Sequence, residues 1–101
     1  MGAMLTPATG AEASLERAKL DASLRAAGLT PRWWSNGPGD TYGEHDHPYH
    51  KVLYCQDGGI VFHTDDGDIA MEPGDRLDIE PHTRHGATVG AGGVVCVEAA
   101  R

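Results

Sequence analysis

Positive charge is scarce in this chain. Two lysines and six arginines face 15 acidic residues, which leaves a formal net charge of −7. Nucleic acids and anionic membrane surfaces are bound by clustered lysine and arginine, and the basic residues here are scattered. The sequence also lacks an apolar run of the roughly 18 residues that a membrane-spanning helix needs, and it lacks a signal-peptide pattern. We therefore expect a cytoplasmic protein with neither nucleic acid nor membrane as partner.

Cysteine is equally scarce. The sequence contains two cysteines, Cys55 and Cys96, and no CxxC spacing. Apolar, strand-forming residues surround both, and a free cysteine behaves as a small buried hydrophobe. We expect two reduced core cysteines, with a single disulfide or a metal role as the alternative. The absence of GxSxG, P-loop and HExxH motifs argues against the hydrolases and nucleotide-binding proteins that carry them.

A length of 101 residues fits one modest core. We expect three segments: residues 1–6, disordered or left over from cloning, an amphipathic helix over 7–29, and a β domain over 30–101. Apolar residues recur at helical spacing within the helical segment, and Gly28 followed by Pro31 provides an end signal. Thr6 before Pro7, or Thr9 with Glu12 three residues later, provides a cap. We expect this helix to cover an open edge or end of the β structure.

Beyond Trp33 the pattern changes to short apolar runs separated by turn residues. The runs that predict strands are residues 53–55, 60–62, 69–71, 77–79, 87–89 and 94–97. The turn signals between them are residues 58–59, 66–67, 73–74 and 90–93, and we interpret the last of these as a hairpin loop. Short strands at even spacing are typical of an all-β sandwich or barrel. Of the adjacent Trp33 and Trp34, one should face inward and one outward.

Metal-binding chemistry is suggested by His45 and His47. Two histidines at positions i and i+2 of a strand project from the same face, because side chains alternate along a strand. Imidazole is the commonest protein ligand for several divalent metals. A third histidine from another strand would complete a facial set and leave open positions for water or substrate. A local cluster of exposed histidines is the alternative interpretation.

The surrounding residues resemble the two motifs of the cupin superfamily. The first motif, G-x5-HxH-x3–4-E-x6-G, matches at Gly39, His45, His47 and Gly58, and the second matches in spacing at Gly74 and His85. The resemblance covers roughly residues 33–98. It implies a double-stranded β-helix jelly-roll barrel with one N-terminal α-helix, and one divalent ion (Zn, Fe, Mn or Ni) held by His45, His47 and His85.

The chain departs from the cupin pattern at four positions. Lys51 stands where cupins supply a carboxylate as fourth ligand, and Glu80, His82 and Val89 replace a proline, a glycine and an asparagine. The metal-ligand role therefore carries over to the three histidines alone, and the fourth ligand stays open.

Lys51 poses an electrostatic problem for that metal. If strand alternation runs unbroken from His45, Lys51 faces the interior, and an ammonium about 5 Å from a divalent ion costs roughly 6–7 kcal/mol at an effective dielectric near 20. A depressed lysine pKa, a nearby carboxylate or an anionic ligand would relieve this repulsion. Alternatively, a bulge at Pro48 would turn Lys51 outward and bring His50 in as a fourth ligand. The last alternative is that no metal binds.

The resemblance to cupin dioxygenases and isomerases implies a metal-dependent reaction on a small organic acid or carbonyl compound, and an anionic ligand would suit Lys51. We expect Lys51 and Tyr49 as candidate catalytic residues. The expected ligand-binding residues are Tyr42, Tyr49, Lys51, Leu53, Phe62 and Leu77. A non-catalytic small-molecule-binding or sensor module is the alternative function.

We also expect a symmetric homodimer, because small jelly rolls expose sheet edges and an apolar outer face. The outer face would carry Val52, Tyr54 and one of Trp33 or Trp34.

Overall fold

The computed structural model describes residues 2–8 and 16–101, and it is all-β apart from one helix, as expected. In chain order the elements are β1 (Ala3–Thr6), α1 (Arg17–Ala26), β2 (Arg32–Asn36), β3 (Thr41–His45), β4 (Lys51–Thr64), β5 (Gly67–Met71), β6 (Arg76–Ile79) and β7 (His85–Ala100). No helix in the described part of the chain has the length and apolar character needed to cross a membrane.

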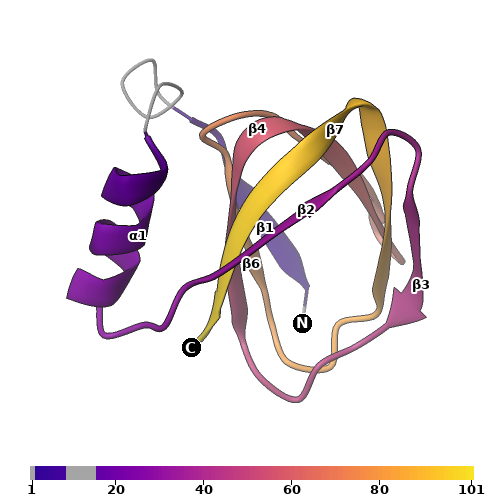
Figure 1. Ribbon diagram of the computed structural model, residues 1–101. Coiled ribbons are helices and arrows are strands. Elements are labelled where there is room, and N and C mark those ends of the chain that lie inside the picture. Colours follow the sequence, from indigo (N-terminus) through magenta and orange to yellow (C-terminus); the bar gives the residue numbers. More distant parts are fainter. Residues whose placement is uncertain (1, 9–15) are drawn as a thin grey trace.

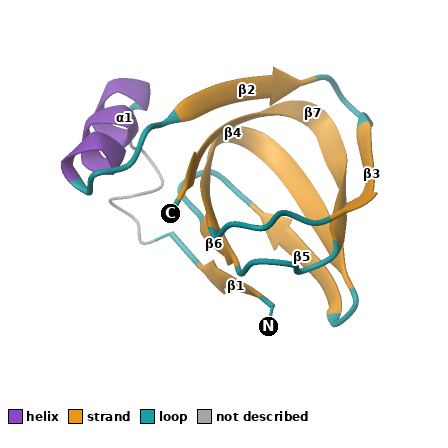
Figure 2. Cartoon of the chain, turned by 90° about the horizontal axis from the view of Figure 1, so that it is seen from below, coloured by secondary structure: helices purple, strands orange, loops and turns teal. Residues whose placement is uncertain are grey.

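The described strands form one seven-stranded antiparallel sheet in the order β1-β6-β4-β7-β2, with β3 also paired to β7 and β5 also paired to β4. The long strands β4 and β7 lie against each other along most of their length. The first half of β4 pairs with β6 and its second half with β5, while β7 pairs first with β3 and then with β2. The sheet therefore curls into the expected jelly-roll barrel, and its strands surround a central space (Figures 1 and 2).

Two of the expected turns are wrong. Residues 58–59 and 90–93 lie inside β4 and β7 and do not reverse the chain. Gly58 (φ +75°) and Gly93 (φ +76°) meet where the β4–β7 register shifts. A Cβ added at Gly58 would lie 2.0 Å from the carbonyl oxygen of Gly93. The glycines therefore let both strands bend together at a close backbone contact, and pairing continues on either side of the bend.

Residues 1–6 were expected to be disordered or left over from cloning, but residues 3–6 form a strand. Strand β1 pairs with β6, with Ala3 opposite Ile79 and Leu5 opposite Leu77. Ala3 and Leu5 pack against the core, whereas Met4 and Thr6 are exposed. This alternation of inward and outward side chains is the local pattern that makes the segment a strand.

The helix is shorter than expected and covers a different surface. It begins at Arg17, with Pro7 and Ala8 outside it, and the proposed cap at Thr9 and Glu12 lies outside the described residues. It ends before Gly28, which takes φ +81°, as the sequence indicated. Buried Leu20 and Leu24 pack against Val52 and Val97.

Because Val52 belongs to β4 and Val97 to β7, the helix covers the outer face of the sheet and does not close an edge or end. Figure 1 shows α1 beside the barrel wall. Val52, which we expected on a dimer surface, is therefore fully buried beneath the protein's own helix.

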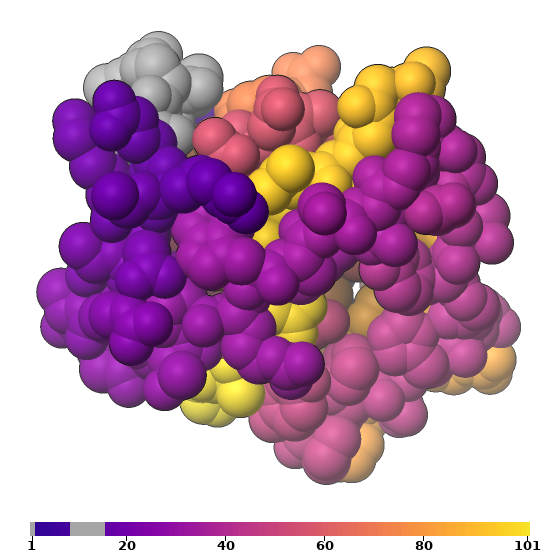
Figure 3. Space-filling view, viewed as in Figure 1, coloured from indigo at the N-terminus to yellow at the C-terminus, as the bar shows by residue number. Residues whose placement is uncertain are grey.

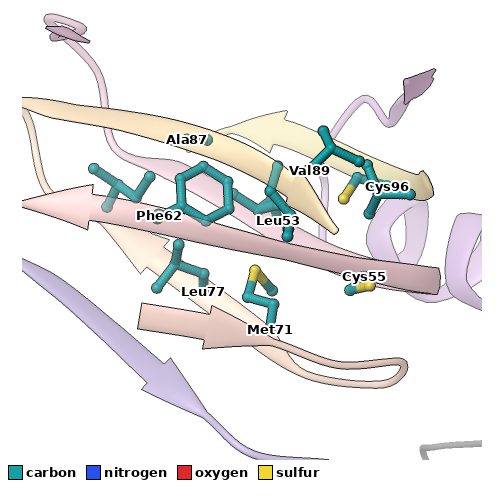
Figure 4. Close-up of a cluster of buried hydrophobic side chains, with 11 residues drawn as sticks. Leu53, Cys55, Phe62, Met71, Leu77, Ala87, Val89 and Cys96 are labelled. Carbon is teal, nitrogen blue, oxygen red and sulfur yellow. The ribbon is translucent and has the colours of Figure 1, made fainter. Parts of the chain in front are cut away.

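The main core fills the closed part of the barrel (Figure 4). Cys55 and Cys96 lie directly opposite each other in the β4–β7 register, fully buried and not disulfide-bonded. The tryptophans divide as expected: Trp34 packs on this core, and Trp33 packs with the helix cluster. The buried members of the main core are Leu53, Cys55, Ile60, Phe62, Met71, Leu77, Ile79, Ala87, Val89, Val94 and Cys96.

Candidate metal centre

Three histidines from two regions of the chain converge at one end of the barrel. His45 ends β3, His85 begins β7, and the two are register partners. His47 follows β3 by two residues. One potential ligand atom from each of the three lies within 4.8 Å of the others. The ring centroid of His45 lies 4.4 Å from that of His85 and 4.8 Å from that of His47.

Backbone carbonyls orient two of these rings. Nδ1 of His45 lies 2.8 Å from the carbonyl oxygen of Gly43, and Nδ1 of His85 lies 2.8 Å from that of Thr83. A carbonyl oxygen only accepts hydrogen bonds, so in the neutral form of each ring Nδ1 carries the proton and Nε2 has the free lone pair. Ligating histidines are commonly held by such a bond from the second ring nitrogen.

The Nε2 atoms of His47 and His85 are buried and have no hydrogen-bond partner among the described residues. A buried polar atom without a partner is costly, unless a ligand or ion satisfies it. Converging, unpartnered imidazole nitrogens are a donor set that suits a divalent transition metal. The residues present therefore fit the metal that the sequence motif implied.

Burial also favours the protonation state that binds metal. Desolvation lowers the pKa of His47, with further lowering from Lys51 and the neighbouring histidines. Desolvation likewise lowers the pKa of His85, although its bond to the Thr83 carbonyl acts in the opposite direction. At neutral pH both rings are therefore neutral, which is the form that coordinates a metal.

A cavity of about 310 Å³ lies beside the three histidines, and we call it the histidine cavity. Figure 3 shows the molecular surface hollowed between the β2–β3 region and the yellow strand β7. The walls of the histidine cavity combine apolar and aromatic side chains with a few charged ones. They are formed by Arg32, Trp33, Trp34, Tyr42, His45, His47, Lys51, Ile60, Phe62, His85, Ala87 and Glu98.

The expected ligand-binding residues divide into two groups. Tyr42, Lys51 and Phe62 line the histidine cavity. Leu53 and Leu77 do not, because they are register partners that are fully buried in the main core. Tyr49, also a candidate catalytic residue, lies outside the lining and packs its ring 5.0 Å from that of His47.

Lys51 points into the cavity, and a carboxylate accompanies it. Its side chain is 11% exposed, and its Nζ lies 3.3 Å from Oε1 of Glu98, whose side chain is 16% exposed. We expected a depressed pKa, a nearby carboxylate or an anionic ligand to relieve the charge of Lys51. The structure contains the nearby carboxylate, which belongs to Glu98. The strand is not continuous from His45, since residues 46–50 lie outside β3 and β4, but Lys51 still begins β4 facing inward.

His50 does not join the cluster, so the alternative in which a bulge brings His50 in as a fourth ligand is wrong. Its Nε2 lies 2.8 Å from Oδ1 of Asp78, on a surface outside the histidine cavity. His63 lies near Asp68 and His82 near Asp46, and neither of these two rings belongs to the three-histidine cluster.

Sequence reasoning missed Arg32 and Glu98 as cavity residues, although alternation could have found them. Glu98 has the same phase along β7 as Cys96, which lies in the core, and Arg32 has the same phase along β2 as Trp34. The two are also register partners. A charged residue that continues an inward-facing apolar series is the signal that was overlooked.

Comparison with known proteins agrees with this geometry. A family model described as a cupin domain matches residues 32–98, which include every residue that lines the histidine cavity. Over 53 residues, or 50% of this chain, the sequence is 40% identical to quercetin 2,3-dioxygenase of Bacillus subtilis (strain 168). The match spans only 16% of that protein.

Solved structures share the fold at low sequence identity. A DUF861 family protein from Thermotoga maritima superposes with a TM-score of 0.67 at 14% identity, covering 98% of this chain and 99% of the other. A cupin superfamily protein from Desulfitobacterium hafniense gives 0.65 at 16% identity, covering 97% and 75%. An RmlC-like cupin from Shewanella frigidimarina gives 0.62 at 24% identity, covering 71% and 65%. At these identities the likeness concerns the fold alone.

Proposed function

Because the chain belongs to the cupin family, we propose that it binds one divalent metal ion through His45, His47 and His85 and acts on a small organic acid or carbonyl compound in the histidine cavity. The observation that carries this proposal is the set of buried, unpartnered Nε2 atoms, with the rings of His45 and His85 oriented by backbone carbonyls. We propose a dioxygenase or an isomerase as the class of enzyme. The local similarity to a quercetin dioxygenase supports the first of these.

The bound ion would supply a Lewis acid for an oxygen atom of the ligand. The chain's own residues would bind and orient that ligand. Phe62, Ile60 and Ala87 form an apolar wall that limits the access of water to it. Burial raises the pKa of Tyr42, so its hydroxyl stays protonated at neutral pH and donates a hydrogen bond to Asn36 Oδ1.

Positive charge in the cavity favours an acidic ligand. Lys51 projects its ammonium into the cavity, and Arg32, which also lines the cavity, has no hydrogen bond or ion pair from its guanidinium to the described part of the chain. A guanidinium can bind a carboxylate through two parallel hydrogen bonds. A small acid could therefore place its carboxylate near Arg32 and Lys51 and another oxygen near the histidines.

Metal content tests the first part of the proposal. We expect elemental analysis to find about one divalent ion per chain in the purified protein, because three convergent imidazoles form a complete facial donor set. Replacement of His45, His47 or His85 by alanine should remove it. His63→Ala is the matched control, since His63 bonds Asp68 and Thr88 away from the cluster and its loss should leave the metal bound. Near-stoichiometric metal in all three cluster variants would refute the assignment.

Activity is tested separately, with metal-loaded protein and a panel of small hydroxy acids, keto acids and flavonols. Oxygen consumption would support a dioxygenase, and conversion of the compound without oxygen uptake would support an isomerase. Tight binding of a compound that is recovered unchanged would instead support a binding or sensor module.

A further inference from the structure

The carboxylate that the cupin pattern places at position 51 has a counterpart elsewhere in this chain. Lys51 occupies that position, and the carboxylate of Glu98 reaches it from β7 at 3.3 Å. Both side chains are more than four-fifths buried, so solvent screens their charges weakly.

Strand geometry holds the two residues on one face. Lys51 pairs with Ala100 in the β4–β7 register, and Leu53 pairs with Glu98. Glu98 is thus the diagonal neighbour of Lys51, and diagonal neighbours lie on the same face of a sheet within reach of long side chains. The ion pair therefore follows from the register of two long strands.

Charge compensation gives this pair a consequence for the metal. Lys51 and the three histidines line the same cavity, and neutral imidazoles do not offset an ammonium. An unpaired ammonium at this site would repel a divalent ion, and the repulsion is strong where little solvent intervenes. Glu98 supplies the one carboxylate among the described residues that line the cavity.

We propose that Glu98 is a positioning residue that holds Lys51 in the histidine cavity and sets the metal affinity of the three histidines by balancing the charge of Lys51, without coordinating the ion itself. This inference rests on the proposed function, because it requires that the histidines bind a metal. It extends that function to a residue outside both cupin motifs.

The experiment measures Zn²⁺ affinity by competition with a chromophoric chelator at pH 7.5. The proteins are the natural chain, Glu98→Gln, Lys51→Met and the Lys51→Met/Glu98→Gln double variant. Glu72→Gln is the control, because it changes the net charge of the chain equally at an exposed position outside the histidine cavity.

We expect a pattern set by charge. Glu98→Gln leaves an unpaired ammonium and should weaken Zn²⁺ binding about tenfold or more, where tenfold corresponds to ~1.4 kcal/mol. Lys51→Met leaves an unpaired carboxylate near the ion and should bind Zn²⁺ more tightly than the natural chain does. The double variant removes both charges and should return to within about threefold of the natural chain, and Glu72→Gln should not differ from it.

Each other outcome has a defined meaning. If the natural chain binds Zn²⁺ and Glu98→Gln binds it equally well, the inference is wrong and the proposed function stands. Equal weakening in Glu98→Gln and the double variant would also overturn it, because Glu98 would then act independently of Lys51. A natural chain that binds no Zn²⁺ would overturn both proposals.

Thermal unfolding of each metal-free protein shows whether it folds. If Glu98→Gln alone does not fold, the comparison of Lys51→Met with the double variant replaces it. Removal of Glu98 from the Lys51→Met background should then lower the affinity back to that of the natural chain. Identical affinities in these two variants would overturn the inference.

Discussion

The contact between Gly58 and Gly93 allows a test of why glycine is required where β4 and β7 bend. Gly58 and Gly39 both have a positive φ of nearly the same value, +75° and +76°. They differ in surroundings, because a Cβ at Gly39 would meet nothing within 4 Å, whereas one at Gly58 would lie 2.0 Å from Gly93 O. Alanine at Gly39 therefore reports the backbone conformation alone, and alanine at Gly58 reports the conformation plus the contact.

The two costs can be separated. Placing a non-glycine residue in the left-handed region costs roughly 1–2 kcal/mol, which is the whole loss expected for Gly39→Ala. Overpacking a close contact adds typically 1–3 kcal/mol, so Gly58→Ala should lose about 2–5 kcal/mol. The atom in the way belongs to the backbone of β7 and cannot turn aside as a flexible side chain would. Relief therefore requires that the two long strands separate at the bend.

Urea unfolding of the metal-free proteins would measure these losses. We expect Gly58→Ala to be about 1–3 kcal/mol less stable than Gly39→Ala, with about 4–8 °C of difference in Tm for each kcal/mol in a domain of this size. Gly58→Ala should also weaken metal binding, because His85 and Phe62 lie beyond the bend. Equal losses of stability in the two variants would show that backbone conformation, and not the contact with Gly93, requires the glycine.

Three further predictions concern packing, pH and ligand binding, and one concerns assembly. Leu24→Ala should cost about 2–5 kcal/mol in urea unfolding and leave metal content unchanged, because Leu24 packs under α1 on the outer face of the barrel, away from the histidines; loss of metal would contradict this separation. Burial lowers the pKa of His47 and His85 in the folded chain. Below about pH 6.5 the unfolded chain therefore binds more protons than the folded chain does, which favours unfolding. The stability of the metal-free protein should thus be full above that pH and fall as the pH drops from about 6.5 towards the lowered pKa values of the folded chain, and a flat profile between pH 7 and 5 would contradict the effect. Lys51→Met should leave the metal bound but weaken any acidic ligand found in the screen, as measured by calorimetry; unchanged affinity would remove Lys51 from the ligand site. The homodimer that we propose from the sequence should appear in sedimentation at tens of micromolar protein, and a monomer alone would argue against it.

Much of the candidate site could be predicted because its signals are local. The HxH pair and the spacing of the second motif identified the three histidines. Unbroken alternation from His45 would place Lys51 on the inner face, where the structure has it, and a bulge at Pro48 was the open alternative. Tyr42 and Phe62 were also expected in the pocket, and both line the histidine cavity. Leu53 and Leu77 were assigned to the ligand site wrongly, because alternation tells which face a residue occupies but not how deep in the barrel it lies.

Glycine was the least reliable signal for the fold. Asp66 and Gly67 mark a true reversal between β4 and β5, whereas Gly58 and Gly93 mark a bend within continuous strands. Both situations need a residue that tolerates positive φ, so the sequence looks alike in the two cases. The difference lies in whether another backbone passes close by.

The sequence by itself determined the class of fold and the metal-ligating histidines that we propose, because each depends on spacing along a single strand or motif. It left open whether Lys51 faces inward, because a bulge between His45 and Lys51 would reverse the facing. Only the tertiary structure decided that Glu98 neutralises Lys51, that His50 turns to Asp78 and that α1 covers the outer face over Val52. These contacts depend on which strands become neighbours and in what register. Register is set by the packing of the whole barrel, since a shift of one residue would turn Glu98 to the opposite face of the sheet.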